Sequence, residues 1–598
     1  MSDFLFTTEP QTKNVLKEAL ERLGDSVQVY QGVWGTLAVT ESKYPGFSPV
    51  ESDEHICVVI GGPVLYFRDN SFIGGNDRQA GTHTILERWQ SGQADWSEDL
   101  SGPFVILVID KATSQVECIT DLMMFIPVYQ CQSNTSVFWG THVDAVARAS
   151  GNQGAFDEAS LVDFILHDAV TYPYTAYKTL KQCQPASIHR LEKQACGDNK
   201  LFEPEPYWQP TESNSFQSLS EAASYLRNGV QGYIDCVTGS LDHVAQFISA
   251  GEDSRSLAGM LPKRLKRDAY IFLDEMNREG RVAKKVAEAY EANFKPDYRS
   301  KAHYLDILPE ASDLVGSGHQ YVHAHTLGFD IKHDFSSYRA VFGGYISDSL
   351  LKAQYAYKHK WLKRFSFLPQ IVVPGENRTQ PIFSDLFSPS VLAEVTRRRT
   401  EHFERVRALR PESAQEWFEL WPATMRVTIP NLYSNRRLFA SHEIFMAKES
   451  VKIAASVPVN WKLNRRLFNK AFKPALKSSR YIPHADGRLP YYAWWANSPL
   501  QFAIWFYRQV ARRTGLNRKN EGPWNDWRQV LASKDWEDRV ECFTNKISVE
   551  ELSQAKDQGA LSGSKLSILS KVNFLQVCYQ LQQNAEVDIA LEAEEKAL

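Results

Sequence analysis

Runs of β-branched and aromatic residues recur along the first 200 residues of the chain. Glycine, aspartate, asparagine or serine bounds each run, which is the pattern of short strands joined by turns. The clearest runs are HICVVI at 55–60, FVILVI at 104–109, VECIT at 116–120 and SVFWG at 136–140. One helix is predicted at 79–92, where Ile85, Leu86 and Trp89 have helical spacing. Many strands and few helices favour packed sheets, so we predict a β-sandwich for residues 1–205.

The pattern changes after residues 203–218, whose three prolines and small polar residues indicate a linker. Ser218 and Glu221 have the spacing of a capping box, which predicts a helix through about residue 236. Apolar strands are then predicted at 244–249 and 269–273, with helical stretches after each. Alternating strands and helices predict a parallel α/β sheet, which we assign to a second domain at 215–598 with a helical C-terminal part.

Composition and charge exclude several classes of protein. The chain has 598 residues, and 67 basic against 71 acidic side chains give a net charge of −4. This balance argues against a nucleic-acid-binding protein. Eight cysteines without a CxxC pair indicate neither a disulfide scaffold nor a zinc site. No signal-peptide pattern and no run long enough to span a bilayer are present, so we expect a cytoplasmic protein with no membrane partner.

The most informative stretch joins the predicted strand at 244–249 to the helix after it. It reads SAGEDS, residues 249–254. In a loop of small residues the backbone N–H groups can turn toward an anion, and the helix N-terminus adds partial positive charge. Ser249 and Ser254 could donate hydrogen bonds to phosphate oxygens, and Asp253 could bind Mg²⁺. A simple turn with an N-cap serine accounts for the same residues equally well.

SAGEDS resembles SGGxDS, the pyrophosphate-binding loop of the N-type ATP pyrophosphatases. The order of motifs after it resembles the synthetase domain of the asparagine synthetase family. These motifs are AYIFLDE at 269–275, the helix with Glu279, Ala283, Val286 and Ala287, the loop 344–348 and the stretch 444–472. Enzymes of this family use ATP to convert a carboxylate into an acyl-adenylate, release pyrophosphate, and let an amine displace AMP.

The resemblance implies roles for the matched residues and implies ATP and Mg²⁺ as cofactors. Asp253 and Asp348 would share the metal ion, which neutralises the leaving pyrophosphate. Two residues are catalytic candidates: Arg465, which would stabilise charge on the acyl-adenylate, and Glu279. The residues expected to bind the nucleotide are Ser249, Gly251, Asp253, Ser254, Gly344 and Ser347.

Several residues depart from the family pattern. Ile346 replaces the second glycine of the G-x-G-x-D loop, and Ser349 stands where a glutamate is usual. Arg465 takes the place of a lysine, and arginine is not a neutral replacement for lysine. Ala447 and Asn469 replace an aspartate and an arginine. These changes leave the identity of the carboxylate substrate open.

The N-terminal region resembles the N-terminal nucleophile glutaminase domain of the same family. The likeness lies in residues 60–62, 100–104, 120–129 and 172–191. The family's nucleophile is a cysteine directly after the initiator methionine, whereas this chain has Ser2 and Asp3. Cys57, the first cysteine, lies in a predicted strand, and the family's glutamine-binding motifs are not visible. We therefore predict a glutaminase-like domain without activity.

The sequence thus predicts ATP-dependent, AMP- and pyrophosphate-forming amide synthesis on a carboxylate, with ammonia or an amine as nitrogen donor. Amidation of a sugar carboxylate, closure of a lactam or peptide ring, and a non-catalytic scaffold are the alternatives, and a homodimer is considered. Two other groups have structural interpretations. His319, His323 and His325 are expected on a helix surface or lining the ATP pocket. The aromatic cluster around Trp494 and Trp495 is expected in the core or a helix seam, with the lining of a sugar or acceptor pocket as the alternative.

Overall fold

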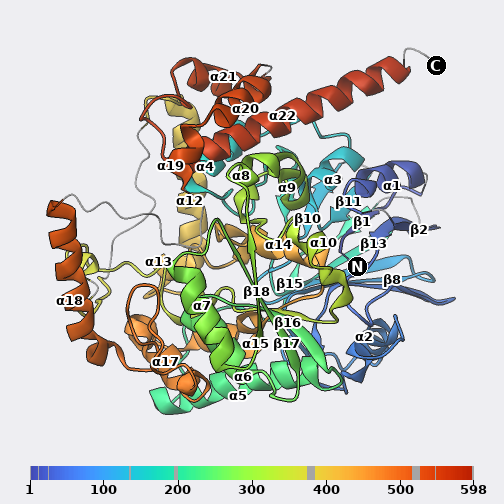
Figure 1. Ribbon diagram of the computed structural model, residues 1–598. Helices are drawn as coiled ribbons and strands as arrows, with labels where there is room; N and C mark the ends of the chain where they lie inside the picture. The colour runs from blue at the N-terminus through green and yellow to red at the C-terminus, as the bar shows by residue number, and fades with distance from the viewer. Residues whose placement is uncertain are drawn as a thin grey trace.

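A computed structural model of the chain describes residues 2–595, apart from residues 11, 25, 134–135, 194–198, 366, 374–383, 515–525 and 546. Antiparallel sheets form the N-terminal part, a parallel sheet follows, and helices dominate the C-terminal part (Figure 1). This arrangement confirms the predicted fold class at the level of its sheets. None of the helices in the described part of the chain combines the length and apolar character needed to cross a bilayer.

The first N-terminal sheet has six strands in the order β12-β10-β11-β1-β3-β2, and every neighbouring pair is antiparallel. Its strands are β1 (Phe4–Thr7), β2 (Val27–Gly32), β3 (Gly35–Thr40), β10 (Tyr129–Gln132), β11 (Val137–Gly140) and β12 (Leu180–Gln182). Helices α1 (Lys13–Glu21) and α3 (Val143–Ala149) pack against this sheet. The sequence pattern did not predict these two helices, because both are short.

The second sheet has the order β14-β13-β9-β8-β5-β4, with β15 paired to β13. Its strands are β4 (Val50–Glu51), β5 (His55–Gly61), β8 (Phe104–Asp110), β9 (Gln115–Thr120), β13 (Ser187–Lys193), β14 (Asn199–Leu201) and β15 (Glu205–Pro206). Helix α2 (Ala80–Gln90) packs against β5. Three of the four predicted strands are β5, β8 and β9 of this sheet, the fourth is β11 of the first sheet, and the predicted helix is α2, so all five predictions are confirmed.

The two antiparallel sheets pack face to face. Phe6 and Leu37 of the first sheet share a buried cluster with Val58 and Leu107 of the second. Alternate residues of each strand point to this cluster, as the period of two requires. With α1 and α3 on one outer face and α2 on the other, the region is a helix–sheet–sheet–helix stack.

Helix α5 (Leu219–Thr238) leads from this region into the parallel sheet. Ser218 Oγ accepts a hydrogen bond from Glu221 N at 3.2 Å, and the Glu221 carboxylate accepts one from Gln217 N at 2.8 Å. The predicted cap is therefore present, although the carboxylate reaches one residue further back than in a standard capping box. Leu226 and Val230 lie on the buried face, as expected.

The parallel sheet has five strands in the order β18-β17-β16-β19-β20. They are β16 (His243–Phe247), β17 (Lys266–Leu273), β18 (Asn293–Tyr298), β19 (Val341–Gly343) and β20 (Ser441–Glu443). Helices α6 (Glu252–Met260) and α7 (Arg278–Ala289) connect the first three strands. The strand β20 was not predicted, and it lies within the C-terminal part that the sequence pattern predicts to be helical.

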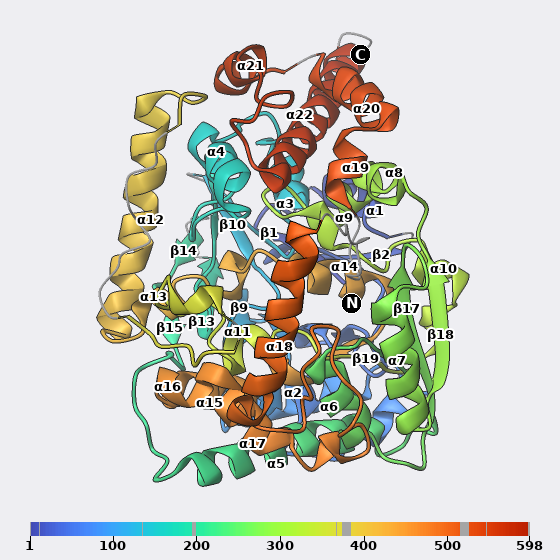
Figure 2. The same cartoon turned by 60° about the vertical axis from the view of Figure 1, so that its left-hand side comes forward.

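Helices form most of the C-terminal part. They include α12 (Pro389–Leu409), α14 (Pro430–Leu438), α15 (Lys448–Ser456), α17 (Arg466–Phe472), α18 (Trp494–Arg513), α20 (Lys534–Thr544), α21 (Glu550–Asp557) and α22 (Ile568–Glu595). Figures 1 and 2 both place α20, α21 and α22 at the end of the molecule opposite α5. The core position predicted for Trp495 is wrong: its side chain is 66% exposed, because α18 lies at the edge of the molecule (Figure 1).

One hydrophobic core joins the N-terminal sheets to the part of the chain that contains the parallel sheet. Met123 and Phe125, which follow β9, share a buried cluster with Val230 of α5, Phe342 of β19 and Met446. Backbone bonds cross the same boundary, since Ala423 N donates to Met123 O at 2.7 Å. The carboxyl edge of the parallel sheet is therefore supported from both parts of the chain.

Candidate functional site

The SAGEDS loop connects β16 to α6 at the carboxyl edge of the parallel sheet. Ser249 Oγ and Ser254 Oγ lie 2.9 Å apart, and Ser249 Oγ accepts a hydrogen bond from Gly251 N at 3.0 Å. The N-cap residue of α6 is Gly251, with no side-chain cap, so the alternative of an N-cap serine is wrong. The serines fold the loop, and the helix N-terminus borders the cavity described below.

Glu279, in the first turn of α7, is hydrogen-bonded to the backbone of the SAGEDS loop. Its Oε1 accepts a hydrogen bond from Ala250 N at 2.7 Å. Burial raises the pKa of Glu279. Because the carboxylate is bound to the loop backbone, the geometry supports a positioning role for Glu279, and its predicted catalytic role stays a prediction.

The second predicted loop, residues 344–348, touches the first. It follows β19 and leads into α11 (Ser347–Leu351). A Cβ atom on Gly344 would lie 3.2 Å from the backbone carbonyl carbon of Asp253, closer than most real Cβ contacts. Glycine at this position therefore lets the two loops approach each other without a shift of the Asp253 backbone.

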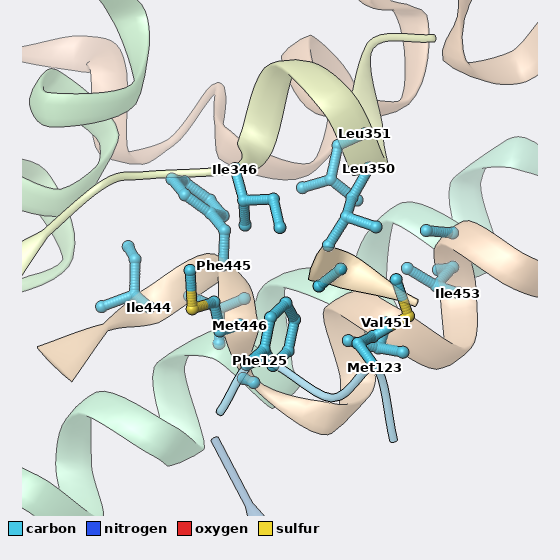
Figure 3. Packing of buried hydrophobic residues seen from close by; sticks show 14 of the residues in the cluster. Met123, Phe125, Ile346, Leu350, Leu351, Ile444, Phe445, Met446, Val451 and Ile453 are labelled. Carbon is cyan, nitrogen blue, oxygen red and sulfur yellow. The ribbon is translucent and has the colours of Figure 1, made fainter. Parts of the chain in front are cut away.

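Ile346, which stands where the resembled motif has a glycine, has a backbone conformation that favours glycine. Its φ is +71°, in the left-handed region that β-branched residues rarely adopt. The side chain is buried in the shared core, and Figure 3 shows it with Leu350 and Leu351 facing Phe445 and Met446. Packing of the side chain therefore compensates for the strained backbone.

Three carboxylates meet where the two loops touch. One oxygen from each of Glu252, Asp253 and Asp348 lies within 4.8 Å of the others. The structure thus brings together Asp253 and Asp348, the two residues expected to share a metal ion. Lys352, which the sequence analysis did not single out, places its Nζ 3.0 Å from Glu252, 2.5 Å from Asp253 and 2.9 Å from Asp348.

Two arginines complete this charged cluster. Arg465 Nε lies 2.5 Å from Glu252 Oε1, and Arg488 Nη1 lies 3.6 Å from Glu252 Oε2. Burial opposes ionisation of Glu252, but Arg465, Lys352 and Arg488 outweigh it and hold its pKa well below the usual range. Burial raises the pKa of Asp253 to about 6; the Lys352 ammonium opposes this, whereas the carboxylates of Asp348 and Glu252 add to it.

The oxygen donors suit Mg²⁺, but the cluster as a whole does not fit a metal ion held by the protein. The Lys352 ammonium is within ion-pair distance of all three carboxylates and occupies the space between them. Lys352, Arg465 and Arg488 together match the charge of the three carboxylates. A divalent ion would have to displace Lys352 before it could bind here.

Two adjoining cavities border the cluster. The larger, of about 730 Å³, is lined by every predicted site residue: Ser249, Gly251, Asp253, Ser254, Glu279, Gly344, Ser347, Asp348 and Arg465. The other, of about 460 Å³, is lined by polar groups that include Lys358, Lys363 and Asn469. Glu252, Asp348, Lys352, Arg465, Asp486 and Arg488 line both.

Some residues at the site were not found by sequence reasoning. Glu443 of β20 lines the larger cavity, and its Oε2 accepts a hydrogen bond from Tyr345 N at 2.9 Å. Tyr270 and Phe272 of β17, with His325, form an aromatic part of the lining. The expectation that the histidines line the pocket thus applies to His325. Ser349 is buried away from the carboxylates and accepts a hydrogen bond from Arg426 Nε at 2.7 Å.

Ser2 and Asp3, the residues directly before β1, are both buried. Ser2 is buried, and its hydroxyl donates to Glu41 O at 3.4 Å. Asp3 is fully buried between Arg436 and Arg437 of α14, with Oδ1 at 3.0 and 2.7 Å from their Nη2 atoms. Arginines from the C-terminal part therefore contact both Ser2 and Asp3, which are almost fully buried.

Burial disfavours the thiolate form of three cysteines in the N-terminal part. Burial raises the pKa of Cys57 to about 12, and it does the same for Cys183. Burial also holds the pKa of Cys118 well above its usual value. Since the thiolate is the nucleophilic form of cysteine, these residues are inert in the folded state. Cys196 lies outside the described residues.

Comparison with known families assigns the N-terminal part. Residues 37–208 match the family model of the glutamine amidotransferase domain. The N-terminal part therefore contains a glutamine amidotransferase-type domain. The matched span covers the second sheet and most of the first, and it ends just beyond β15.

No curated protein matches the chain. Among solved structures, the allosteric regulatory enzyme of purine biosynthesis is 10% identical, with 49% of this chain and 80% of that chain covered and a TM-score of 0.23. The glutamine phosphoribosylpyrophosphate amidotransferase from B. subtilis, complexed with ADP and GMP, is 7% identical over 51% of this chain and 92% of that chain, with a TM-score of 0.21. Likenesses this weak carry no argument about this protein.

Proposed function

We propose that the chain is an ATP-dependent ligase that activates a carboxylate as an acyl-adenylate and forms an amide. The observation that carries the proposal is the position of the larger cavity in the parallel sheet. From β16 the chain adds β17 and β18 on one side, and it adds β19 and β20 on the other. The cavity lies at the carboxyl edge between β16 and β19, which is the topological switch point where open α/β sheets bind ligands.

The lining of the larger cavity suits a nucleotide. Tyr270 and Phe272 supply an aromatic surface for a base, as ring stacking requires. The N-terminus of α6 and the cations Lys352, Arg465 and Arg488 supply positive charge for phosphates. The cavity thus has an aromatic part and a positively charged part, which matches a ligand with an apolar and an anionic end.

The smaller cavity would hold the carboxylate substrate. It shares Arg465 and Arg488 with the nucleotide cavity, so a carboxylate bound there would lie next to the phosphates. Lys358 adds a half-buried ammonium to its wall. Burial lowers the pKa of Lys358, and the nearby Lys363 ammonium adds to this effect. A substrate carboxylate would relieve the repulsion between these cations.

The proposed chemistry has two steps. A carboxylate oxygen attacks the α-phosphorus of ATP, the bond to the β-phosphate oxygen breaks, and pyrophosphate leaves. Ammonia or an amine then attacks the acyl carbon, and AMP leaves with the electrons of the acyl–oxygen bond. Arg465 and Arg488 would neutralise charge that develops on the phosphates and on the departing AMP. No step is assigned to Mg²⁺, whose binding by Asp253 and Asp348 stays a prediction.

The nitrogen source is proposed to be free ammonia or an amine substrate. The N-terminal domain is of a type named for glutamine amidotransfer, but the residues before its first strand are the buried Ser2 and Asp3. Amidation of a sugar carboxylate, ring closure, and a non-catalytic scaffold are distinguished by the assay below.

Hydroxylamine trapping tests the proposal. The full chain is incubated with ATP, hydroxylamine and a panel of carboxylates that includes aspartate and uronic acids, with and without Mg²⁺. We expect hydroxamate and AMP in equal amounts with at least one carboxylate. Asp253→Ala should abolish both products, because it breaks the contact between the two loops.

The matched control is Asp53→Ala, an exposed aspartate in the N-terminal domain, which should keep full activity. Absence of AMP with every carboxylate, while ATP still binds to the protein, would contradict the ligase and favour the scaffold alternative.

A further inference from the structure

Lys352 is held in place by more than its ion pairs. Its side chain is only 5% exposed, and Nζ lies 4.2 Å from the centre of the Phe468 ring of α17. The aromatic face attracts the ammonium, and the hydrocarbon stem is buried beside α11. Three carboxylates and one ring therefore fix the same nitrogen atom, so the side chain is pre-organised where it is.

The charges around Lys352 leave little attraction for another cation. Glu252, Asp253 and Asp348 contribute three negative charges, and Lys352, Arg465 and Arg488 offset them. Asp486 is already paired with Arg488 at 2.7 Å. Removal of the ammonium from its site would leave the partly buried Asp253 without its ion pair, which is unfavourable, whereas Glu252 would keep Arg465 and Arg488.

We propose that Lys352 is a resident cation that takes the place of a protein-bound divalent metal ion between Asp253 and Asp348. The ammonium joins the two loops as a shared metal would, and it presents its charge to the polyphosphate of the bound nucleotide. Lys352 is thus a nucleotide-positioning residue. The proposal rests on the proposed nucleotide site, but its statement about the metal concerns the protein alone.

Binding of Mn²⁺ to the nucleotide-free chain tests the metal part directly. Titration followed by electron paramagnetic resonance should show no saturable site at the three carboxylates of the wild-type protein. Lys352→Met, which keeps the stem and removes the charge, should bind Mn²⁺ at least about tenfold more tightly. The additional change Asp348→Asn should remove that new site. Lys470→Met, at an exposed lysine on α17, is the matched control and should behave as the wild type.

The proposal would be overturned if the wild-type chain bound Mn²⁺ and the single variant Asp348→Asn did not, because a metal ion would then displace Lys352. This comparison uses no Lys352 variant, so it decides the question even if Lys352→Met does not fold.

Nucleotide binding gives a second, separate result. By calorimetry, the wild-type chain should bind ATP in excess EDTA with an affinity within about threefold of that with Mg²⁺. Lys352→Met should lose binding in EDTA and recover it with Mg²⁺. A wild-type chain that binds ATP only with Mg²⁺ would overturn the proposal. Failure to bind ATP under every condition would instead refute the proposed function, and the Mn²⁺ titration would still decide the role of Lys352.

Discussion

Asp3 shows how a single buried carboxylate connects two distant parts of the chain. It lies between Arg436 and Arg437, which are more than 400 positions away in the sequence, and all three side chains are almost fully buried. Burial opposes its ionisation, but the two arginines outweigh burial and hold the pKa of Asp3 below its usual range. The residue before β1 thus serves the contact with α14.

We expect Asp3→Asn to destabilise the protein by about 3–5 kcal/mol, because it leaves two buried guanidinium groups without their carboxylate. Urea unfolding of the variant and the wild type measures the difference. Asp53→Asn, at an exposed site, should change the free energy of unfolding by less than about 0.5 kcal/mol. A comparable small change for Asp3→Asn would show that the ion pairs are not formed in solution.

Glu443 predicts a pH dependence of stability. Burial raises its pKa to about 7 in the folded protein, and the hydrogen bond from Tyr345 N opposes this only in part. The folded state therefore holds a proton that the unfolded state releases at lower pH, so stability falls as the pH rises from about 4.5 through about 7. Glu443→Gln should remove this loss.

The wild type should lose about 1–3 kcal/mol relative to Glu443→Gln between pH 5 and pH 8. Burial also raises the pKa of Asp121 to about 7, but Asp121 is present in both proteins and cancels in the difference. Chemical denaturation at several pH values measures it. A constant difference across this range would contradict the buried position of Glu443.

At the scale of elements, the turn before α11 combines a strained backbone with a buried side chain. Ile346 has φ +71°, and its side chain packs in the core shared by both parts of the chain. The left-handed conformation costs about 1–2 kcal/mol for a residue with a Cβ, whereas loss of a buried isoleucine side chain costs about 2–5 kcal/mol. The packing term is the larger of the two.

Ile346→Gly should therefore destabilise the protein by about 1–3 kcal/mol, even though glycine is the residue of the family motif. Ile346→Ala loses the side chain and keeps the strain, so it should be less stable than Ile346→Gly by about 1 kcal/mol. Thermal and urea unfolding of the two variants give the order. An alanine variant more stable than the glycine variant would show that this residue does not have a positive φ.

Whether an element could be predicted depended on its length and on whether it needs a neighbouring strand to form. The strands at 55–60 and 104–109 have long apolar runs, and α5 has a recognisable cap. Strand β20 has three residues, Ser-His-Glu, and it is a strand only because β19 lies beside it. No periodicity exists in so short and polar a segment.

At the scale of the whole molecule, the two predicted domains share buried surface. Met123 and Phe125 pack with residues of α5, β19 and the segment before α15. Lys448 and Lys452 of α15 form ion pairs with Glu98, and Arg398 of α12 pairs with Asp157. The predicted boundary between residues 205 and 215 is therefore visible in the sequence, but the parts on either side of it pack against each other.

A fragment of residues 215–598 should accordingly fail to form a well-packed structure on its own, because loss of the N-terminal part exposes this apolar surface. We expect strong binding of a hydrophobic dye and loss of the near-ultraviolet circular dichroism of the intact chain. A monomeric fragment with an intact near-ultraviolet spectrum would contradict a shared core.

The local pattern of residues was enough to predict the strongest strands, the cap of α5 and the SAGEDS loop, because turn chemistry and periodicity act over a few neighbouring positions. The loop 344–348 was predicted only from its resemblance to the asparagine synthetase family. The charged centre of the site depended on contacts over long distances. Lys352 and Asp253 are 99 positions apart, and Glu443 reaches Tyr345 across 98 positions. A lysine in an otherwise ordinary helix end gives no local signal that three carboxylates surround it. Only the fold brings these charges together. It therefore decides whether the carboxylates are free to bind a metal ion or are already paired with a lysine.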